Sequence, residues 1–179
     1  MDLCLRFFFA DKATILVEEP FYRTAIQALE ALGKKLEFLP HDKFGDDMNL
    51  PPADAILLTP SRQFPLGGTI DLTQRLNLLK WAKDIDAMII EDDYDSEIRF
   101  EAMPMTAIQG LDESGSVIYF GTFSKTLFAC LQCAYMVVPS CLCERLINFR
   151  NLVDRRAVTF VEEALANFIN GGHYARHLR

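Results

Sequence analysis

The stretch V-I-Y-F-G-T-F-S-K at residues 117–125 decides how the rest of the chain is interpreted. Its first four residues are apolar and favour a β-strand, and Gly121 ends that run. Lys125 then follows two hydroxyl residues, Thr122 and Ser124, and precedes apolar residues. The pattern predicts a lysine that is held out of bulk water at the end of a buried strand. Desolvation lowers the pKa of an ammonium group, so such an amine can form a Schiff base with a carbonyl compound. A solvated surface lysine is the ordinary alternative.

The composition is that of a globular protein with an excess of acidic residues. Of 179 residues, 50% are hydrophobic, and 25 acidic against 18 basic residues give a net charge of −7. An acidic chain without a basic run is a poor candidate for binding nucleic acid, which proteins contact mainly through lysine and arginine. No stretch approaches the roughly 18 apolar residues of a membrane span, and the first residues lack the basic start of a secretory signal. We therefore expect a cytoplasmic protein whose present segment binds neither nucleic acid nor membrane.

The cysteines do not form a recognisable framework. Cys130 and Cys133 have the C-x-x-C spacing, and Cys141 and Cys143 follow closely. An odd cysteine count in a cytosolic chain argues against disulfides, and the residues around the C-x-x-C pair are mostly apolar. A structural zinc site would need four ligands in one tetrahedron. We expect small buried thiols and no bound metal.

Short apolar runs alternate with segments of helical spacing along the chain. Strands are predicted at residues 14–19, 36–39, 55–59, 87–90, 116–120 and 134–138. Helices are predicted at residues 2–9, 21–32, 72–84, 141–153, 159–169 and at the end of the chain, with loops at 41–52 and 60–68. Asp71 is the expected N-cap of the helix at 72–84. This alternation predicts an α/β fold of three layers, in which helices cover both faces of a mostly parallel sheet.

Residues 91–97, E-D-D-Y-D-S-E, directly follow a predicted buried strand, and ligands of parallel sheets bind beyond such strand ends. An EF-hand loop starting at Asp93 would need glycine at Ile98 and glutamate at Pro104, so it is excluded. A nucleotide-hydrolysing site would need a P-loop, and residues 121–126 lack the glycine before the lysine. A carboxylate aimed at a protonated ring nitrogen, with a tyrosine two residues later, fits a pyridoxal phosphate site. Taken alone, the motif is equally consistent with a solvated acidic turn.

A third loop, T-P-S-R-Q-F-P-L-G-G at residues 59–68, also follows a predicted buried strand. Its two prolines and two glycines fix the loop shape, although a plain connection between elements would have the same composition. We expect the three loops to lie at successive strand ends of one sheet.

With these segments the chain resembles fold-type-I pyridoxal-phosphate-dependent aminotransferases of class I/II, and within them the aminotransferase-like domain of MocR-type regulators of the GntR family. The matching segments are V-E-E-P-F-Y (17–22), T-P-S-R-Q-F-P-L-G (59–67), I-I-E-D-D-Y-D-S-E-I-R-F (89–100), G-T-F-S-K-T-L-F (121–128) and G-H-Y-A-R-H-L-R (172–179). The resemblance implies that residues 1–179 are part of the large, cofactor-binding domain, incomplete at both ends. The N-terminal winged helix, the family's phosphate loop and the small domain with the arginine for the substrate carboxylate would lie outside it.

The resemblance also implies roles for particular residues. Lys125 would carry the Schiff base with pyridoxal 5'-phosphate, while Asp92 would pair with the pyridine nitrogen. Tyr94 would contact the phenolic oxygen, and Tyr22 would stack on the ring. The implied activity is transfer of an amino group from an amino acid or another amine, carried out by a homodimer. The hydroxyl residues implied to bind the phosphate are Ser124 and Thr122.

The chain also departs from the family pattern. Gln132 stands where an arginine usually grips the phosphate, and losing such a contact costs about 1.5–3 kcal/mol, or roughly ten- to a hundredfold in affinity. Ala129 and Ala134 replace a proline and a glycine, and Arg62 and Leu66 replace a histidine and a threonine. Three functions therefore stay open: a pyridoxal-phosphate-binding aminotransferase, the effector-sensing domain of a MocR-type regulator, and a decayed fragment without catalysis.

Overall fold

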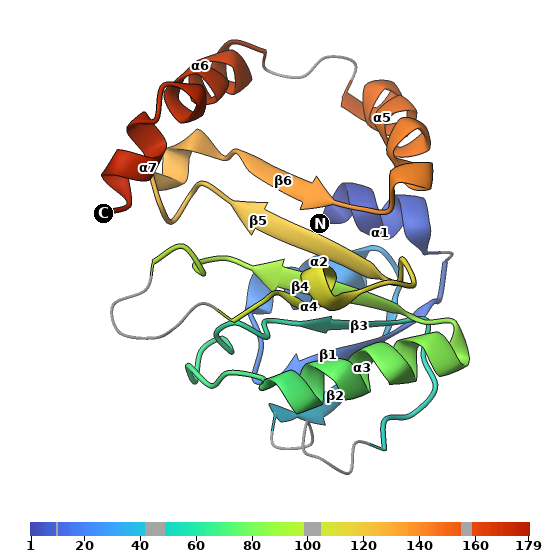
Figure 1. Cartoon of the computed structure of the whole chain (residues 1–179). Helices are drawn as coiled ribbons and strands as arrows, with labels where there is room; N and C mark the ends of the chain where they lie inside the picture. The colour runs from blue at the N-terminus through green and yellow to red at the C-terminus, as the bar shows by residue number, and fades with distance from the viewer. Residues whose placement is uncertain (10, 42–48, 99–104, 155–158) are drawn as a thin grey trace.

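A six-stranded sheet runs through the protein in the computed structural model, which describes residues 1–9, 11–41, 49–98, 105–154 and 159–179 (Figure 1). Its strands are β1 (Thr14–Glu19), β2 (Lys35–Pro40), β3 (Ala55–Leu58), β4 (Met88–Asp93), β5 (Val117–Thr122) and β6 (Ala134–Val137). They lie in the order β2-β1-β3-β4-β5-β6, and all neighbours are parallel except β5 and β6, which are antiparallel.

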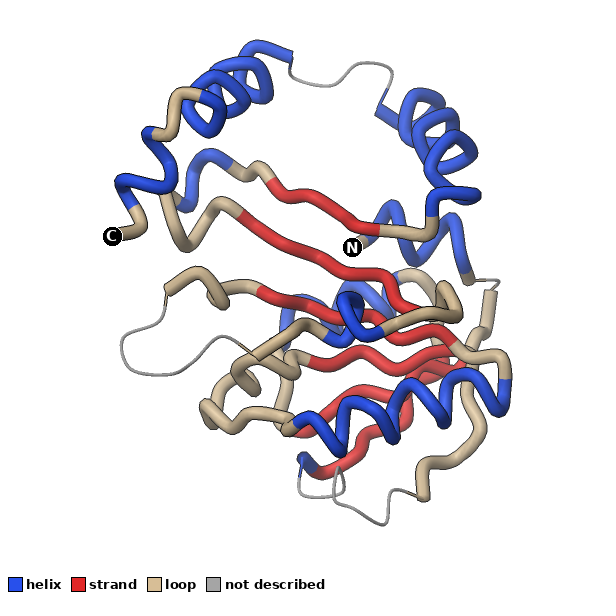
Figure 2. The backbone as a smooth tube through the Cα atoms, in the orientation of Figure 1, coloured by secondary structure: helices blue, strands red, loops and turns tan. Residues whose placement is uncertain are grey.

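Helices pack on both faces of this sheet (Figure 2). The helices of the protein are α1 (Asp2–Phe8), α2 (Arg23–Ala31), α3 (Leu72–Ile85), α4 (Ile108–Leu111), α5 (Ser140–Asp154), α6 (Thr159–Asn170) and α7 (His173–His177), with a 3-10 turn, η2, at Ala129–Leu131. Of these, α5 and α6 lie beyond the β6 edge of the sheet (Figure 1). One apolar core contains residues of α1 and α2, and the other contains residues of α3 and α4. This arrangement confirms the predicted three-layer α/β fold with a mostly parallel sheet.

The two cores explain why the central strands are apolar without alternation. Along β1, Ile15 and Val17 pack into the core that contains Leu29 of α2, whereas Leu16 packs into the core that contains Leu78 of α3. Successive side chains of a strand point to opposite faces, so a strand covered on both sides needs an apolar residue at every position.

The predicted elements lie close to their predicted positions, with four differences. The strand β5 does not end before Gly121, as predicted, but continues through it to Thr122. The helix α4 was not predicted, because four residues are too few to give a helical period. The strand β4 extends beyond the predicted residues 87–90, since Glu91, Asp92 and Asp93 continue the ladder with β5. The last strand returns antiparallel. Residues 42–48 of the predicted loop at 41–52 lie outside the described residues.

The predicted cap of α3 is confirmed in atomic detail. The Asp71 carboxylate accepts a hydrogen bond of 2.9 Å from the backbone N–H of Gln74, and the Gln74 side-chain oxygen accepts one of 2.9 Å from the backbone N–H of Asp71. This reciprocal capping box satisfies two donors that a helix start leaves free. It also fixes where the loop at residues 59–68 joins the helix.

The prediction of small buried thiols is wrong for most of the cysteines. Cys4 is buried in the core, but Cys130, Cys141 and Cys143 are exposed, and Cys133 is partly exposed. The exposed thiols follow β5 in the chain, where η2 and α5 leave the sheet and have fewer neighbours to cover them. Within the described ranges, no helix has the length and apolar character needed to cross a membrane.

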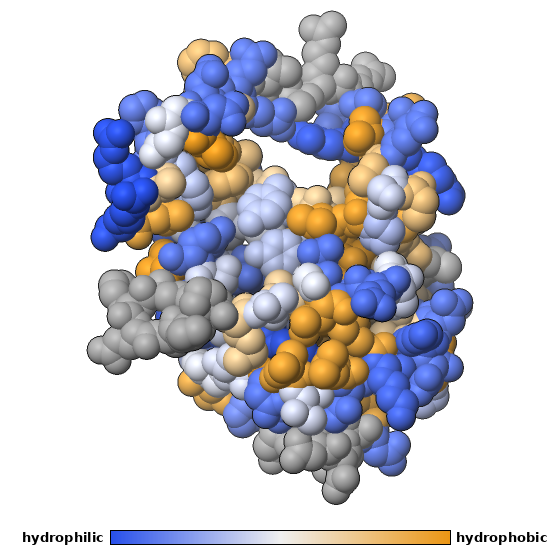
Figure 3. Space-filling view, in the orientation of Figure 1, coloured by the Kyte–Doolittle hydropathy of each residue, from blue (hydrophilic) through white to orange (hydrophobic). Residues whose placement is uncertain are grey.

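Figure 3 shows apolar surface in two places, one over α3 and α4 and the other beyond the β6 edge, around the hollow below α5 and α6. A cavity of about 470 Å³ lies between α1, β6 and α5 and includes Met136 and Leu146 in its lining. Another of about 470 Å³ lies between Leu127 and Phe168 of α6. Three consecutive acids, Glu91, Asp92 and Asp93, lie at the carboxyl end of β4.

Candidate active site at the carboxyl ends of the strands

The three loops highlighted by the sequence follow neighbouring strands. The strands β3, β4 and β5 are adjacent and parallel, with Leu58 opposite Glu91 and Asp93 opposite Gly121. Their carboxyl ends therefore meet at one edge of the sheet, as expected. Residues 59–68, the acidic segment and the lysine turn start there.

The three consecutive acids at the end of β4 point to alternating faces of the sheet. Ile89 packs into the core with α3, and Ile90 packs into the core with α2. Because side chains alternate along a strand, Glu91 and Asp93 lie on the α3 face and Asp92 lies on the other. Glu91 and Asp93 are hydrogen-bonded within the protein, whereas no hydrogen bond of the Asp92 side chain is seen among the described residues.

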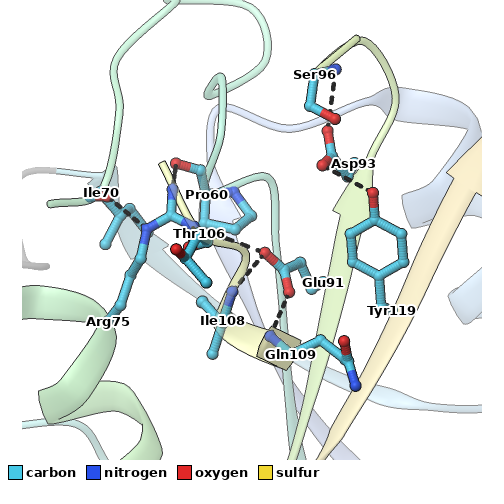
Figure 4. Close-up of polar contacts among 10 residues, drawn as sticks. All are labelled: Pro60, Ile70, Arg75, Glu91, Asp93, Ser96, Thr106, Ile108, Gln109 and Tyr119. Carbon is cyan, nitrogen blue, oxygen red and sulfur yellow. Dashed lines mark hydrogen bonds and ion pairs between the residues drawn. The ribbon is translucent and has the colours of Figure 1, made fainter. Parts of the chain in front are cut away.

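Glu91 is fully buried and anchors α4 (Figure 4). Its two carboxylate oxygens accept hydrogen bonds from the backbone N–H groups of Ile108, at 3.0 Å, and Gln109, at 2.9 Å. The guanidinium of Arg75 lies 3.8 Å from the same carboxylate. Burial raises the pKa of Glu91, although the two hydrogen bonds and the Arg75 charge oppose the shift.

Arg75 is also fully buried and ties three segments together (Figure 4). It donates hydrogen bonds to the backbone carbonyl oxygens of Ile70 at 2.8 Å, Pro60 at 2.9 Å and Thr106 at 3.0 Å. A buried charge is tolerated only when it is paired and hydrogen-bonded, and Arg75 meets both conditions. The Arg75 and Glu91 pair therefore fixes the start of the loop at residues 59–68. The sequence alone does not predict this pair.

Asp93 shapes the turn after β4. One carboxylate oxygen accepts a hydrogen bond of 2.9 Å from the Tyr119 hydroxyl, and the other accepts one of 3.1 Å from the backbone N–H of Ser96 (Figure 4). Burial, followed by the negative charge of Asp93, raises the pKa of Tyr119, which keeps this phenol as the donor. Asp93 is therefore engaged within the protein.

Asp92 is the available carboxylate of the three. It is half-buried at the end of β4, next to β5. Removal from water raises the pKa of Asp92 to about 6, the amino group of Met1 opposes the shift, and the negative charge of Asp93 adds to it. At neutral pH this carboxyl is still mostly ionised, so it can pair with a positively charged group of a ligand.

Three aromatic rings form a cluster beside these acids. The Phe64 ring lies edge-on to Tyr22, with 5.7 Å between ring centroids, and edge-on to Tyr94, with 6.0 Å. Both geometries are favourable for aromatic pairs. Removal from water raises the pKa of Tyr94 to about 12, with the negative charge of Asp95 adding to the shift, so this phenol stays protonated. Phe64 thus brings together Tyr22 and Tyr94, the two tyrosines that the resemblance implied would contact the cofactor. The resemblance implied no role for Phe64 itself.

Lys125 lies in the turn after β5 and is exposed. The residue that points inward is Thr126, which is 5% exposed. Its hydroxyl accepts a hydrogen bond of 2.9 Å from the Tyr174 hydroxyl, and its carbonyl oxygen lies 2.7 Å from Nε2 of His177. The prediction that Lys125 is held out of bulk water is therefore wrong for this structure, because the turn buries the neighbouring threonine instead.

The hydroxyl residues before the lysine differ in their contacts. The Thr122 hydroxyl accepts a hydrogen bond of 3.2 Å from the backbone N–H of Ser124 and donates one of 3.4 Å to the carbonyl oxygen of Cys133. Thr122 therefore shapes the turn itself. Gln132, at the end of η2, is exposed and has a left-handed backbone with φ of 48°. A cationic side chain is missing at this position, as the sequence predicts.

Gly121 is required where it stands. A Cβ atom added at this residue would lie 2.2 Å from Cζ of the Tyr135 ring. Tyr135 comes from the antiparallel strand β6 and also packs against Tyr119 and Phe123. The glycine that ends the apolar run of β5 therefore lets β6 approach the lysine turn closely.

No protein-family model matches the chain. A probable rhizopine catabolism regulatory protein MocR from Rhizobium meliloti is 40% identical over 185 residues, and the match covers 100% of this chain and 37% of that protein. The chain therefore spans little more than a third of this relative.

Solved structures of aminotransferases share the fold of this chain. The Pyrococcus horikoshii kynurenine aminotransferase, solved in complex with PMP, has a TM-score of 0.88 and 26% identity, covering 99% of this chain and 47% of that chain. The multiple substrate aminotransferase from Thermococcus profundus has a TM-score of 0.89 and 27% identity, covering 99% and 47%. A MocR-type regulator is thus similar to this chain over the whole of residues 1–179, and aminotransferases share its fold, so the chain is similar to both groups of proteins.

Proposed function

We propose that this chain binds pyridoxal 5'-phosphate at the carboxyl ends of β4 and β5, as part of an aminotransferase-like protein. The observation that carries the proposal is the available carboxylate of Asp92, half-buried and with its pKa raised to about 6, on the strand beside the one that leads into the Lys125 turn. Acid and amine on adjacent strand ends are the pair that this cofactor needs. The similar kynurenine aminotransferase binds PMP, the amine form of the cofactor.

The side chains present at the site match the polar groups of the cofactor. Asp92 would hold the proton on the ring nitrogen, and Tyr94, as a protonated phenol, would donate to the phenolic oxygen. Tyr22 is 50% exposed and would stack on the ring. Lys125 is exposed and accessible for covalent attachment, and Ser124 and Thr122 supply hydroxyls for the phosphate.

Pyridoxal phosphate, when bound, supplies an aldehyde and an electron-withdrawing ring that together acidify the α-proton of an amino acid. The chain supplies the proton positions. A positive charge on the ring nitrogen would lower the pKa of Asp92 again, so the ionised carboxylate and the protonated ring would stabilise each other. The Lys125 amine would take up and return the α-proton after its release. We expect the ligand to be an amino acid or another amine, and the working protein to be a homodimer.

A sensing domain is the second candidate. The regulator from Rhizobium meliloti is 40% identical to the chain, whereas the similar aminotransferases are 26% and 27% identical. In this case the same residues would bind an amino compound and report its presence without releasing a product. Gln132 is uncharged and cannot make a charge-assisted hydrogen bond to the phosphate, so cofactor binding should be weak. Weak binding favours a sensing domain, or the loss of the cofactor site, over an aminotransferase.

Absorption spectroscopy with added pyridoxal phosphate tests the proposal. The purified chain is expected to develop a visible band above that of the free cofactor, and borohydride should fix the cofactor to Lys125, as mass spectrometry of the peptides would show. Lys125→Ala should fold, as judged by circular dichroism, and lack the fixed adduct. Lys12→Ala serves as the matched control, because Lys12 is also exposed but lies far from Lys125 in the sequence. A folded wild-type chain without an adduct would disprove the proposal.

Turnover separates the two candidates once the adduct is seen. A set of amino acids is added to the loaded chain, and the release of oxo acid is measured. Repeated release with a second oxo acid as acceptor supports an aminotransferase, whereas a spectral change without release supports a sensing domain.

A further inference from the structure

Glu18 is a buried carboxyl at the end of β1, with a relative exposure of 1%. Its Oε1 accepts two hydrogen bonds from Thr59, one from the backbone N–H at 2.8 Å and one from the hydroxyl. Its Oε2 is buried and has no hydrogen-bond partner among the described residues. Among the described residues, the hydrogen bonds of this carboxyl therefore both come from Thr59, the first residue of the loop at residues 59–68.

Thr59 passes this contact on to Phe64. Its single hydroxyl proton goes to Glu18, so its oxygen lone pairs are available, and one accepts a hydrogen bond of 3.1 Å from the backbone N–H of Phe64. Thr59 is itself buried, at 2% exposure. The loop is held a second time by Gln63, whose side-chain nitrogen donates to the carbonyl oxygens of Pro20 at 2.6 Å and Phe64 at 2.8 Å.

The series ends at the aromatic cluster. Phe64 is the ring that contacts both Tyr22 and Tyr94, at 5.7 Å and 6.0 Å between centroids. Tyr22 follows β1, whereas Tyr94 follows β4, and β3 lies between these strands in the sheet. The loop after β3 therefore sets the position of the ring that joins the two tyrosines.

We propose that Glu18 is a positioning residue for the cofactor site, acting through Thr59 and Phe64 to hold Tyr22 and Tyr94 in place. This inference rests on the proposed function. Glu18 would touch neither cofactor nor substrate. Its effect would be to fix the loop so that the ring of Tyr22 and the hydroxyl of Tyr94 are already oriented before the cofactor arrives, which reduces the ordering needed on binding.

The polar character of Glu18 supports a role of this kind. Burying a carboxyl with one oxygen unpartnered is unfavourable, and an apolar residue would fill the position without that penalty. Burial raises the pKa of Glu18 to about 7, with the two Thr59 hydrogen bonds opposing the shift and the Asp92 charge adding to it. A neutral acid still accepts both hydrogen bonds at its carbonyl oxygen. The relay therefore needs an acceptor at this position and does not need the charge.

Two pairs of variants of the full chain test the relay. Thr59→Ser keeps the hydroxyl, whereas Thr59→Val removes it with little change in volume. Glu18→Gln keeps an acceptor oxygen, whereas Glu18→Ala removes it. We expect the serine and glutamine variants to bind pyridoxal phosphate within about threefold of wild type. The valine and alanine variants should bind about tenfold more weakly, since each removes two of the hydrogen bonds that hold the loop.

A spectroscopic signal of the cofactor-free chain separates positioning from stability. Near-ultraviolet circular dichroism reports the tyrosine environments, and urea unfolding reports stability. The expected result is a changed tyrosine signal in Thr59→Val and an unchanged signal in Thr59→Ser, with both variants folded. If Thr59→Val folds and has the same tyrosine signal and the same cofactor affinity as the wild type, the relay is overturned. This outcome decides the question even if Glu18→Ala fails to fold. A wild-type chain that gives no adduct would disprove the proposed function instead, while the tyrosine signal would still decide whether the relay exists.

Discussion

The Tyr174 hydroxyl of α7 donates a hydrogen bond of 2.9 Å to the hydroxyl of Thr126, the residue directly after Lys125. His177, also in α7, approaches the carbonyl oxygen of Thr126 to 2.7 Å. The Tyr174 ring packs edge-on against Phe123, with 5.6 Å between centroids. The last helix therefore holds both sides of the lysine turn, although it lies 48 residues further along the chain.

Replacing Tyr174 with phenylalanine should weaken this attachment without disturbing the ring contact. The expected loss is about 0.5–1.5 kcal/mol in the free energy of unfolding, which is the usual net value of one hydrogen bond. Urea unfolding of Tyr174→Phe, Thr126→Val and the double variant measures it as a double-mutant cycle. If the hydrogen bond contributes, the two effects will be less than additive, and strict additivity would contradict the contact.

Arg75→Met should strongly destabilise the fold. The change removes three hydrogen bonds to backbone carbonyls and leaves the buried Glu91 carboxylate without its counter-charge. Removing one partner of a buried ion pair typically costs about 3–5 kcal/mol. The exposed Lys83, on the last turn of the same helix, provides the control as Lys83→Met, for which we expect a change within about 0.5 kcal/mol. Equal urea midpoints for the two variants would rule out the anchoring role.

The stability of the protein should depend on pH through Glu18. Its pKa is about 7 in the folded protein against 4.5 for the ordinary group, so the folded state holds this proton more tightly. The resulting stability is fully present below about pH 4.5 and is lost as the pH rises through about 7, by about 3 kcal/mol at most. The titratable groups near Glu18 are Asp92, whose negative charge adds to the shift, the protonated phenol of Tyr94, and His41, which lines the same cavity of about 190 Å³.

Urea unfolding between pH 4.5 and 8 tests this dependence. The wild-type chain should lose more stability over this range than Glu18→Gln, which cannot titrate. Asp92, with its pKa raised to about 6, acts in the same direction in both proteins, so the difference between the two curves isolates Glu18. Parallel curves would show that this carboxyl is ionised in the folded protein.

Gln132→Arg should strengthen cofactor binding if the proposed site is correct. A guanidinium at this exposed position would add a charge-assisted contact to the phosphate and raise affinity roughly ten- to a hundredfold. Gln132→Glu is the matched control and should weaken binding by repulsion. Titration of both variants with pyridoxal phosphate measures the effect, and shifts of the same sign in the two would argue against phosphate near this residue.

The architecture could be predicted from the sequence because local patterns determine it. The apolar runs of β1 and β3, the Asp71 cap and Gly33 at the end of α2 each mark an element boundary within a few residues. The order of the three loops along one sheet edge also followed, since parallel strands joined by helices place their carboxyl ends together.

The direction of individual side chains could not be predicted in the same way. The pattern of hydroxyls, Lys125 and apolar residues did not reveal that Thr126 would face inward, because a turn has no fixed period. Arg75 and Glu18 are buried, and each has a hydrogen-bond partner more than 30 residues away in the sequence. From sequence alone, a charged residue in a helix or at a strand end is expected to be exposed to solvent. Such long-range polar contacts need the fold to be known first.

The alternation of acids along β4 also limits where residues can be inserted or deleted during evolution. Glu91 and Asp93 bind groups on one face, and Asp92 is available on the other. Inserting or deleting one codon between Met88 and Asp92 would rotate the following side chains to the opposite face, burying the available acid and exposing the anchors. A substitution in β4 changes one side chain and leaves the others on their faces. Insertions and deletions are therefore tolerated only in the connections outside this strand.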